Sequence, residues 1–128
     1  MSTAESLAYC SEDCKLIIVY VFEPLAVPLP DYLVSVEVSS EPEEYLMKAR
    51  NLMNEHVGRI NMLAGREICE GKVMMGKPIE NILKIIDNYT PDLVVMGSRG
   101  LGFKKGIFLG SVSARVSASS PVSVLIVR

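Results

Sequence analysis

Residues 94–116, VVMGSRGLGFKKGIFLGSVSARV, place glycines directly after a short apolar segment. Gly97 closes that segment, Gly100 follows three residues later, and Gly110 stands beside Ser111 at the start of a helical pattern. The first amides of a helix have no acceptor within it, and glycine removes the Cβ that would hold a phosphate away. The stretch predicts a strand, a phosphate-binding loop that reaches positive φ in places, and a helix whose Ser111 and Ser113 hydroxyls donate to phosphate oxygens.

Basic residues follow Gly97 in the same stretch. Arg99, Lys104 and Lys105 would supply cations to an anionic ligand. A second interpretation remains: the glycines build turns and the lysines form a solvated face. The third glycine, followed by serines at a helix start, favours phosphate binding over turns alone.

Continuous apolar segments, typical of buried strands, alternate with segments in which apolar residues recur every three or four positions, typical of helices. We predict strands at 15–21, 66–76, 92–97 and 122–128, and helices at 2–14, 42–63, 78–90 and 110–120. Ser2 and Glu5 predict a capping box at the first helix. The proline-rich residues 22–41 predict a long loop with an extended segment at 32–38.

This alternation predicts one α/β domain over residues 1–128 with a mostly parallel sheet. In such sheets ligands bind beyond the carboxyl ends of the strands. Gly97 and Gly100 lie at such an end, so the glycine loop and the expected ligand edge coincide.

Composition excludes several classes of protein. Hydrophobic residues make up 49% of the 128 residues, too many for a disordered chain. The net charge of -2 gives no footprint for nucleic acid or an anionic membrane, and the sequence shows neither a membrane-spanning segment nor a signal peptide. We therefore expect a cytoplasmic protein.

Cysteine and histidine usage predicts neither a disulfide framework nor a metal site. Cys10, Cys14 and Cys69 are expected to be reduced, with Cys10 and Cys14 on one face of the first helix. The lone His56 lies inside a helical pattern and has no second histidine to help it bind a metal.

The segment GSRGLGFKKGIFLGS fits the pattern G-x2-G-x9-G-(S/T), and it resembles the ATP-binding branch of the universal stress protein family. PDLVVMGSRG is similar to that family's fourth strand, GKPIENIL to the start of its third helix, and GSVSARVSASSPVSVLIVR to its last helix and strand. The resemblance covers about residues 2–128 and is most specific from Pro91 onward.

The resemblance implies a doubly wound, parallel five-stranded sheet of the adenine nucleotide alpha-hydrolase-like type, with strand order 3-2-1-4-5. It implies ATP, with or without Mg²⁺, at the point where the strand order reverses, and a homodimer paired through the last strand, VSVLIVR. By motif position, the residues that would contact the phosphates and ribose are Gly97, Arg99, Gly100, Gly110, Ser111, Val112 and Ser113. Met96 would lie beside the ribose, and the Val21 backbone would contact the adenine.

The sequence departs from the family at its beginning. The family opens with a strand and an adenine-reading aspartate, whereas here no apolar strand precedes STAES, so the first strand is apparently missing. That strand is central in the implied order, and without it two buried strands lose hydrogen-bond partners. Either the sequence omits residues of the real polypeptide, or the protein is shortened and its sheet re-pairs or borrows a strand.

We predict a regulatory, stress-related protein that binds an adenine nucleotide without dedicated catalysis, with at most slow ATP hydrolysis. The pattern G-x4-G-K-[ST] is absent, and the carboxylates of Asp87 and Asp92 precede the strand at its opposite end. Two alternatives are an ATP-using enzyme of the alpha-hydrolase kind and a dimerisation module of the same fold whose pocket is empty.

Overall fold

The computed structural model describes residues 2–24, 42–98 and 109–128, and its contacts divide the chain into two compact units. One unit is Ile17–Gly76, here called the β1–β2 unit; the other is Met1–Leu16 with Lys77–Arg128, here called the β3–β4 unit. The predicted extended segment at 32–38 and the predicted loop residues Arg99, Gly100, Lys104 and Lys105 lie outside the described residues.

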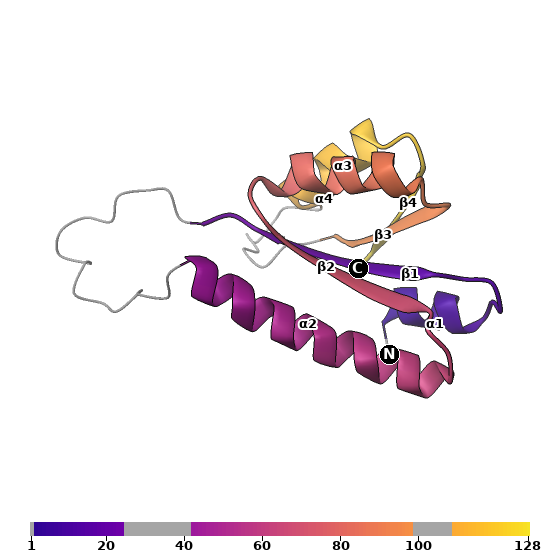
Figure 1. Cartoon of the computed structure of the whole chain (residues 1–128). Helices are drawn as coiled ribbons and strands as arrows, with labels where there is room; N and C mark the ends of the chain where they lie inside the picture. The colour runs from indigo at the N-terminus through magenta and orange to yellow at the C-terminus, as the bar shows by residue number, and fades with distance from the viewer. Residues whose placement is uncertain (1, 25–41, 99–108) are drawn as a thin grey trace. The chain divides into compact units, whose positions relative to one another are not determined.

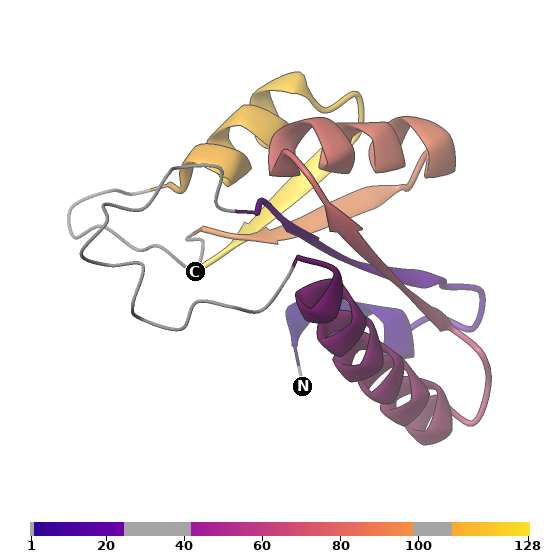
Figure 2. The same cartoon turned by 60° about the vertical axis from the view of Figure 1, so that its left-hand side comes forward.

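The β1–β2 unit contains two strands and a long helix (Figures 1 and 2). Strand β1 (Leu16–Phe22) and strand β2 (Cys69–Met75) are neighbours in one sheet, and helix α2 (Pro42–Ala64) packs along β2. The predicted strand and helix are confirmed to within a residue at each end. Strand β2 begins three residues later than expected, because residues 66–68 form the connection from α2.

Asn61 fixes the connection between α2 and β2. Its Oδ1 accepts hydrogen bonds from the backbone amides of Ile68 and Cys69, each at 2.8 Å, and its Nδ2 donates to the Cys69 carbonyl at 3.0 Å. Ile68 and Cys69 are buried, so these backbone groups need protein partners. One side chain therefore sets where the chain leaves the helix and enters the strand.

We expect Asn61→Ala to lower the free energy of unfolding by about 2 to 3 kcal/mol, because it leaves buried amide groups without partners. Asn51→Ala is the matched control: Asn51 is exposed on the same helix, so its replacement should change stability by less than about 0.5 kcal/mol. Urea unfolding followed by circular dichroism measures both. Equal stability of the two variants would contradict the role given to Asn61.

The β3–β4 unit holds three helices and two strands in its described residues. The elements are α1 (Thr3–Tyr9), α3 (Pro78–Tyr89), β3 (Leu93–Gly97), α4 (Ser111–Ser119) and β4 (Ser123–Val127). Strands β3 and β4 are parallel, with Leu93 opposite Ser123 and Gly97 opposite Val127. Helices α3 and α4 pack together on one face of this sheet, where Ile86 and Val116 are buried (Figures 1 and 2).

Helix α1 starts as predicted and ends early. The Ser2 hydroxyl accepts from the Glu5 amide while the Glu5 carboxylate accepts from the Ser2 amide, which confirms the capping box. The helix stops at Tyr9, so the prediction of a helix to residue 14 was wrong, and Cys10 and Cys14 do not share a helix face. After Tyr9 the residues Ser11 and Asp13 favour turns because their side chains compete for backbone hydrogen bonds.

The termini of α3 follow the sequence signals. Pro78 occupies the first turn, where its missing amide hydrogen has no partner to lose. Thr90 closes the helix in the left-handed region (φ 40°, ψ 58°), with its amide donating to the Ile86 carbonyl at 2.9 Å. The chain then passes through Pro91 into β3, as the position of that proline predicts.

The strand pairs agree with the order that the family resemblance implies. Among the four described strands, β1 neighbours β2 and β3 neighbours β4, the two adjacencies that remain in 3-2-1-4-5 when the first strand is left out. In the described part of the chain, β1 and β3 belong to separate two-stranded sheets. No described helix combines the length and apolar character needed to cross a bilayer.

Candidate functional site

Hydrogen bonds within the β3–β4 unit hold the carboxyl end of β3 against the start of α4. The amide of Ser98, just beyond β3, donates to the Val127 carbonyl at 2.8 Å, which extends the β3–β4 pairing by one residue. The Ser98 carbonyl accepts from the amide of Gly110, the residue that precedes α4, at 2.6 Å. Residues 98 and 110 are thereby joined, and α4 begins at the carboxyl end of β3.

Ser113 adds a side-chain bond to this junction. Its hydroxyl donates to the Gly97 carbonyl at 2.6 Å, and the Ser113 residue is buried, with 5% of its surface exposed. The predicted donation from Ser113 to a phosphate oxygen is therefore replaced in this structure by a bond to Gly97. The hydroxyl of Ser111, in contrast, lies on an exposed residue at the first position of α4.

The first turn of α4 presents amides without acceptors. The first intrahelical bond runs from the Ala114 amide to the Gly110 carbonyl at 2.9 Å, and no side chain caps the helix. Within residues 2–24, 42–98 and 109–128, the amides of Ser111, Val112 and Ser113 therefore have no hydrogen-bond acceptor. These groups and the helix dipole give this end of α4 partial positive charge.

Positive φ does not explain the glycines at this junction, Gly97 and Gly110. Gly110 has φ -63° and ψ 152°, a conformation open to any residue, and Gly97 lies in a regular strand. Positive φ occurs among the described glycines only at Gly65 and Gly76. The prediction of positive φ was therefore wrong for Gly97 and Gly110, and what Gly110 retains is the absence of a side chain beside the free amides.

Replacing Ser113 tests the junction. We expect Ser113→Ala to lower the free energy of unfolding by about 1 kcal/mol, because it removes the hydrogen bond to the Gly97 carbonyl. Ser111→Ala is the matched control, since an exposed hydroxyl two residues earlier should change stability by less than about 0.5 kcal/mol. Urea denaturation of both variants provides the measurement, and equal losses would show that the Ser113 bond does not stabilise the junction.

Val21, the residue predicted to contact the adenine, belongs to the β1–β2 unit. It occupies the sixth position of β1, between Tyr20 and Phe22. The Tyr20 and Tyr45 hydroxyls are 2.8 Å apart, and the rings of Phe22 and Tyr45 meet edge to face with centroids 4.7 Å apart. This aromatic contact attaches the first turn of α2 to the carboxyl end of β1, where Val21 lies.

The hydrogen bond with Tyr45, with a smaller contribution from burial, raises the pKa of Tyr20 above its usual value of 10.0. Tyr20 is therefore protonated at neutral pH. Sequence reasoning missed this cluster because Tyr20 and Tyr45 are 25 residues apart and the intervening loop carries no pairing signal.

Comparison with known proteins now decides the family. The model of the universal stress protein family matches residues 4–128. This chain belongs to the universal stress protein family. Its relatives include the "Universal stress protein in QAH/OAS sulfhydrylase 3'region" of Thermus aquaticus, 34% identical over 89% of this chain and 77% of that protein. The stress response protein NhaX of Bacillus subtilis (strain 168) is 34% identical over 78% of this chain and 59% of that protein.

Solved structures of universal stress proteins share the fold. The universal stress protein UspA from Lactobacillus plantarum superposes with a TM-score of 0.73 at 20% identity, covering 98% of this chain and 84% of that one. A universal stress protein solved in complex with cAMP superposes with a TM-score of 0.63 at 26% identity, covering 98% and 81%. The predicted α/β class and the adenine nucleotide alpha-hydrolase-like architecture are confirmed.

In this universal stress protein, six of the predicted ligand contacts fall in one unit. Met96 and Gly97 end β3, Gly110 precedes α4, and the first turn of α4 supplies the remaining three: Ser111, Val112 and Ser113. Ser98 is a residue that sequence reasoning missed: it bonds both to Val127 and to Gly110. Its position between Gly97 and Arg99, two predicted contacts, could have drawn attention to Ser98. A serine after a strand, however, has no characteristic role of its own.

The other reactive side chains give no metal centre among the described residues. All three cysteines are free thiols, with Cys69 buried and Cys10 exposed. The described residues hold no group of three or more His, Cys, Asp or Glu side chains that could hold a metal ion. Asp92 precedes β3 and so lies at the opposite end of that strand from the α4 amides.

Proposed function

We propose that this universal stress protein binds an adenine nucleotide, with ATP as the principal ligand, and that its phosphates occupy the first turn of α4. The observation that supports this proposal is the set of three amides at the carboxyl end of β3, those of Ser111, Val112 and Ser113, that have no acceptor among the described residues. Phosphate oxygens are the acceptors that such a helix start favours, because several amides and the dipole act on one anion.

The nucleotide class is supported by a relative. The universal stress protein in complex with cAMP is 26% identical to this chain over nearly its whole length, and cAMP is an adenine nucleotide with one phosphate. We extend its ligand class to this chain and assign ATP from the match to the G-x2-G-x9-G-(S/T) pattern, whose Arg99 and Gly100 lie outside the described residues. Met96 would lie beside the ribose and the Val21 backbone at the adenine; Mg²⁺ would enter bound to the triphosphate.

Binding without dedicated catalysis is the second part of the proposal. Within the described residues, the hydroxyl nearest to the free amides in sequence is Ser111, and no carboxylate or histidine is bonded to it that could serve as a general base. The protein would then respond to nucleotide state as a cytoplasmic stress regulator. Release of pyrophosphate or phosphate from ATP at a rate of catalytic turnover would contradict this part.

Gly110→Val tests the phosphate assignment. The φ of -63° at Gly110 permits valine, so the fold should persist while the added side chain lies beside the free amides. We expect the affinity for a fluorescent ATP analogue to fall by more than about tenfold, a loss of at least 1.4 kcal/mol. Fluorescence anisotropy titration, repeated with ATP and with cAMP as competitors, measures the loss.

Ala118→Val is the matched control, because it adds the same side chain at an exposed position near the other end of α4. It should bind the analogue as the parent does. If Gly110→Val binds as tightly as Ala118→Val, the phosphates do not occupy the start of α4. If the parent binds no adenine nucleotide at all, the domain is a dimerisation module with an empty pocket.

We also propose that two copies of the chain pair through β4. Strand β4 is apolar, has β3 as its one neighbour in the described chain, and exposes 39% of Leu125. Such an edge readily adds another strand.

A lysine at Leu125 places a charge at this edge, so Leu125→Lys should be monomeric at concentrations where the parent is dimeric. Leu93→Lys, at an equally exposed leucine of β3, should stay dimeric. Sedimentation velocity distinguishes the two species. Dissociation of both variants alike would place the dimer contact elsewhere.

A further inference from the structure

A cavity of about 300 Å³ lies in the β1–β2 unit between the side of α2 and strand β2. Arg50, Met53 and Asn54 line it from α2, and four consecutive residues line it from β2: Gly71, Lys72, Val73 and Met74. Consecutive strand residues point their side chains to opposite faces. The four residues therefore belong to both faces of the strand. A cavity that all four line runs along the strand backbone and is not confined to one face.

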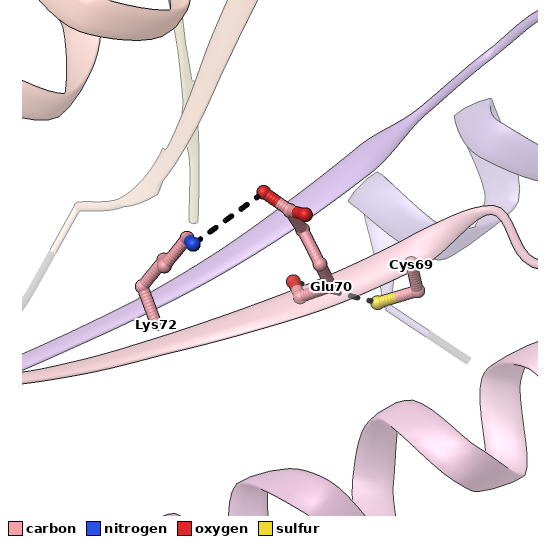
Figure 3. Close-up of polar contacts among 3 residues, drawn as sticks. All are labelled: Cys69, Glu70 and Lys72. Atoms are coloured by element: carbon pink, nitrogen blue, oxygen red, sulfur yellow. Dashed lines mark hydrogen bonds and ion pairs between the residues drawn. The ribbon is translucent and has the colours of Figure 1, made fainter.

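The face that each β2 residue occupies is set by Gly71. A Cβ on Gly71 would run into the Cγ and Sδ of Met53 and would approach Val57 at 3.1 Å, so position 71 faces α2. Glu70 and Lys72 extend from the other face of β2, away from α2, and form an ion pair at 3.8 Å (Figure 3). The Lys72 charge is thus held by Glu70, and the other polar side chains that line the cavity, those of Arg50 and Asn54, come from α2.

One edge of β2 faces no other strand of the described chain, because β1 is its single neighbour in a two-stranded sheet. At such an edge, the amide and carbonyl of every second residue point outward and can pair with an added strand. The cavity is lined by α2 and β2 and by no described residue of β1, so it lies toward this edge and gives room for a strand next to α2. We call this cavity with the adjoining strand edge the β2 groove. It is bordered by the edge from Gly71 to Met74 and by Arg50, Met53 and Asn54 of α2.

Arg50 gives the β2 groove its charge. Its guanidinium is exposed and, within the described residues, has no hydrogen-bond or ion-pair partner. Asn54 lies one helical turn later on the same side of α2 and adds an amide donor. A planar guanidinium with free donors matches a carboxylate in two hydrogen bonds. The Met53 side chain supplies an apolar surface beside these polar groups.

We propose that the β2 groove binds an extended peptide segment of another protein, which adds to β2 as a strand and places an acidic side chain against Arg50. Main-chain hydrogen bonds to the edge supply affinity, and the carboxylate contact with Arg50 and Asn54 selects the sequence. A side chain two residues from the acidic one faces α2 as well and lies about 7 Å further along, where an aliphatic group meets Met53. The site shares no residue with the proposed nucleotide site.

The probe is a fluorescein-labelled peptide, acetyl-Thr-Val-Glu-Val-Thr-Val amide, added to the full chain and followed by fluorescence anisotropy. We expect saturable binding that weakens about tenfold when the glutamate becomes glutamine, since a charge-assisted contact is lost. A peptide with proline in place of the valine after glutamate should not bind, because it lacks a ladder amide and its ring resists strand pairing. Amide resonances of Gly71–Met74 should shift during the titration.

Arg50→Gln should weaken binding of the glutamate peptide by about tenfold and leave the glutamine peptide unchanged. Lys48→Gln is the matched control, because it removes the same charge from α2 at a residue that does not line the cavity. Gly110→Val should bind the peptide as the parent does, whether or not it binds nucleotide. These three variants separate failure of the groove from failure of the nucleotide site.

Several results would overturn the proposal. If the proline peptide binds as tightly as its parent, strand addition is excluded. If Lys48→Gln weakens binding as much as Arg50→Gln does, the effect of Arg50 is one of overall charge and not of a specific contact. Absence of saturable binding would exclude the groove as a peptide site. If Arg50→Gln changes the sedimentation of the protein alone while the peptide does not bind, the occupant is a second copy of this chain and not another protein.

Discussion

The hydrogen bond between the Gly110 amide and the Ser98 carbonyl is the contact on which the functional edge depends. It joins the residue after β3 to the residue before α4, and the Ser113–Gly97 bond holds the first turn of the helix in place. Because the amide of Gly110 is used in this way, the three amides that follow it are the ones left without an acceptor in the described residues. The same bonds that build the junction therefore decide which groups remain free.

Glycine stands at different positions of this chain for different physical reasons, and the backbone angle φ helps to distinguish them. Gly65 (φ 68°) follows the last residue of α2 and Gly76 (φ 139°) follows β2, so both adopt conformations that other residues enter only at a cost. Gly71 is needed because Met53 occupies the place of its Cβ. At Gly110 the first reason does not apply, since its φ is ordinary.

The sequence predicted the elements well because their signals are local. Continuous apolar segments and three-to-four-residue spacing located every described strand and the three longer helices, and the serine–glutamate pair located the start of α1. The end of α1 was missed because Cys10 to Cys14 have weak preferences that allow a helix without requiring one. Helix α1 is seven residues long, and so short a helix adds few hydrogen bonds that could carry it through such a segment.

The candidate site was predictable in outline but not in its contacts. Unpaired amides at a helix start follow from helix geometry alone, so Ser111, Val112 and Ser113 could be named from the chain. The partner of the Ser113 hydroxyl could not, because Gly97 is 16 residues away and only the packed structure brings the two together. The Tyr20–Tyr45 contact and the three bonds of Asn61 are of the same kind.

In the part of the chain that the structure describes, both sheets expose an unpaired strand edge, but the residues beside the two edges differ in chemistry. Within the described residues each strand has a single neighbour, and the two proposals concern the unpaired edge of β4 in one unit and that of β2 in the other. Strand β4 carries only Ser123, valine, leucine and isoleucine, so its edge distinguishes poorly between partners and suits an identical strand at close register. Strand β2 carries the Glu70–Lys72 pair on one face. On the other it lies beside Arg50, which has no ion-pair partner within the described residues, so a partner there would match a charge as well as a backbone. The two proposals thus assign selectivity between partners to β2 and self-recognition to β4.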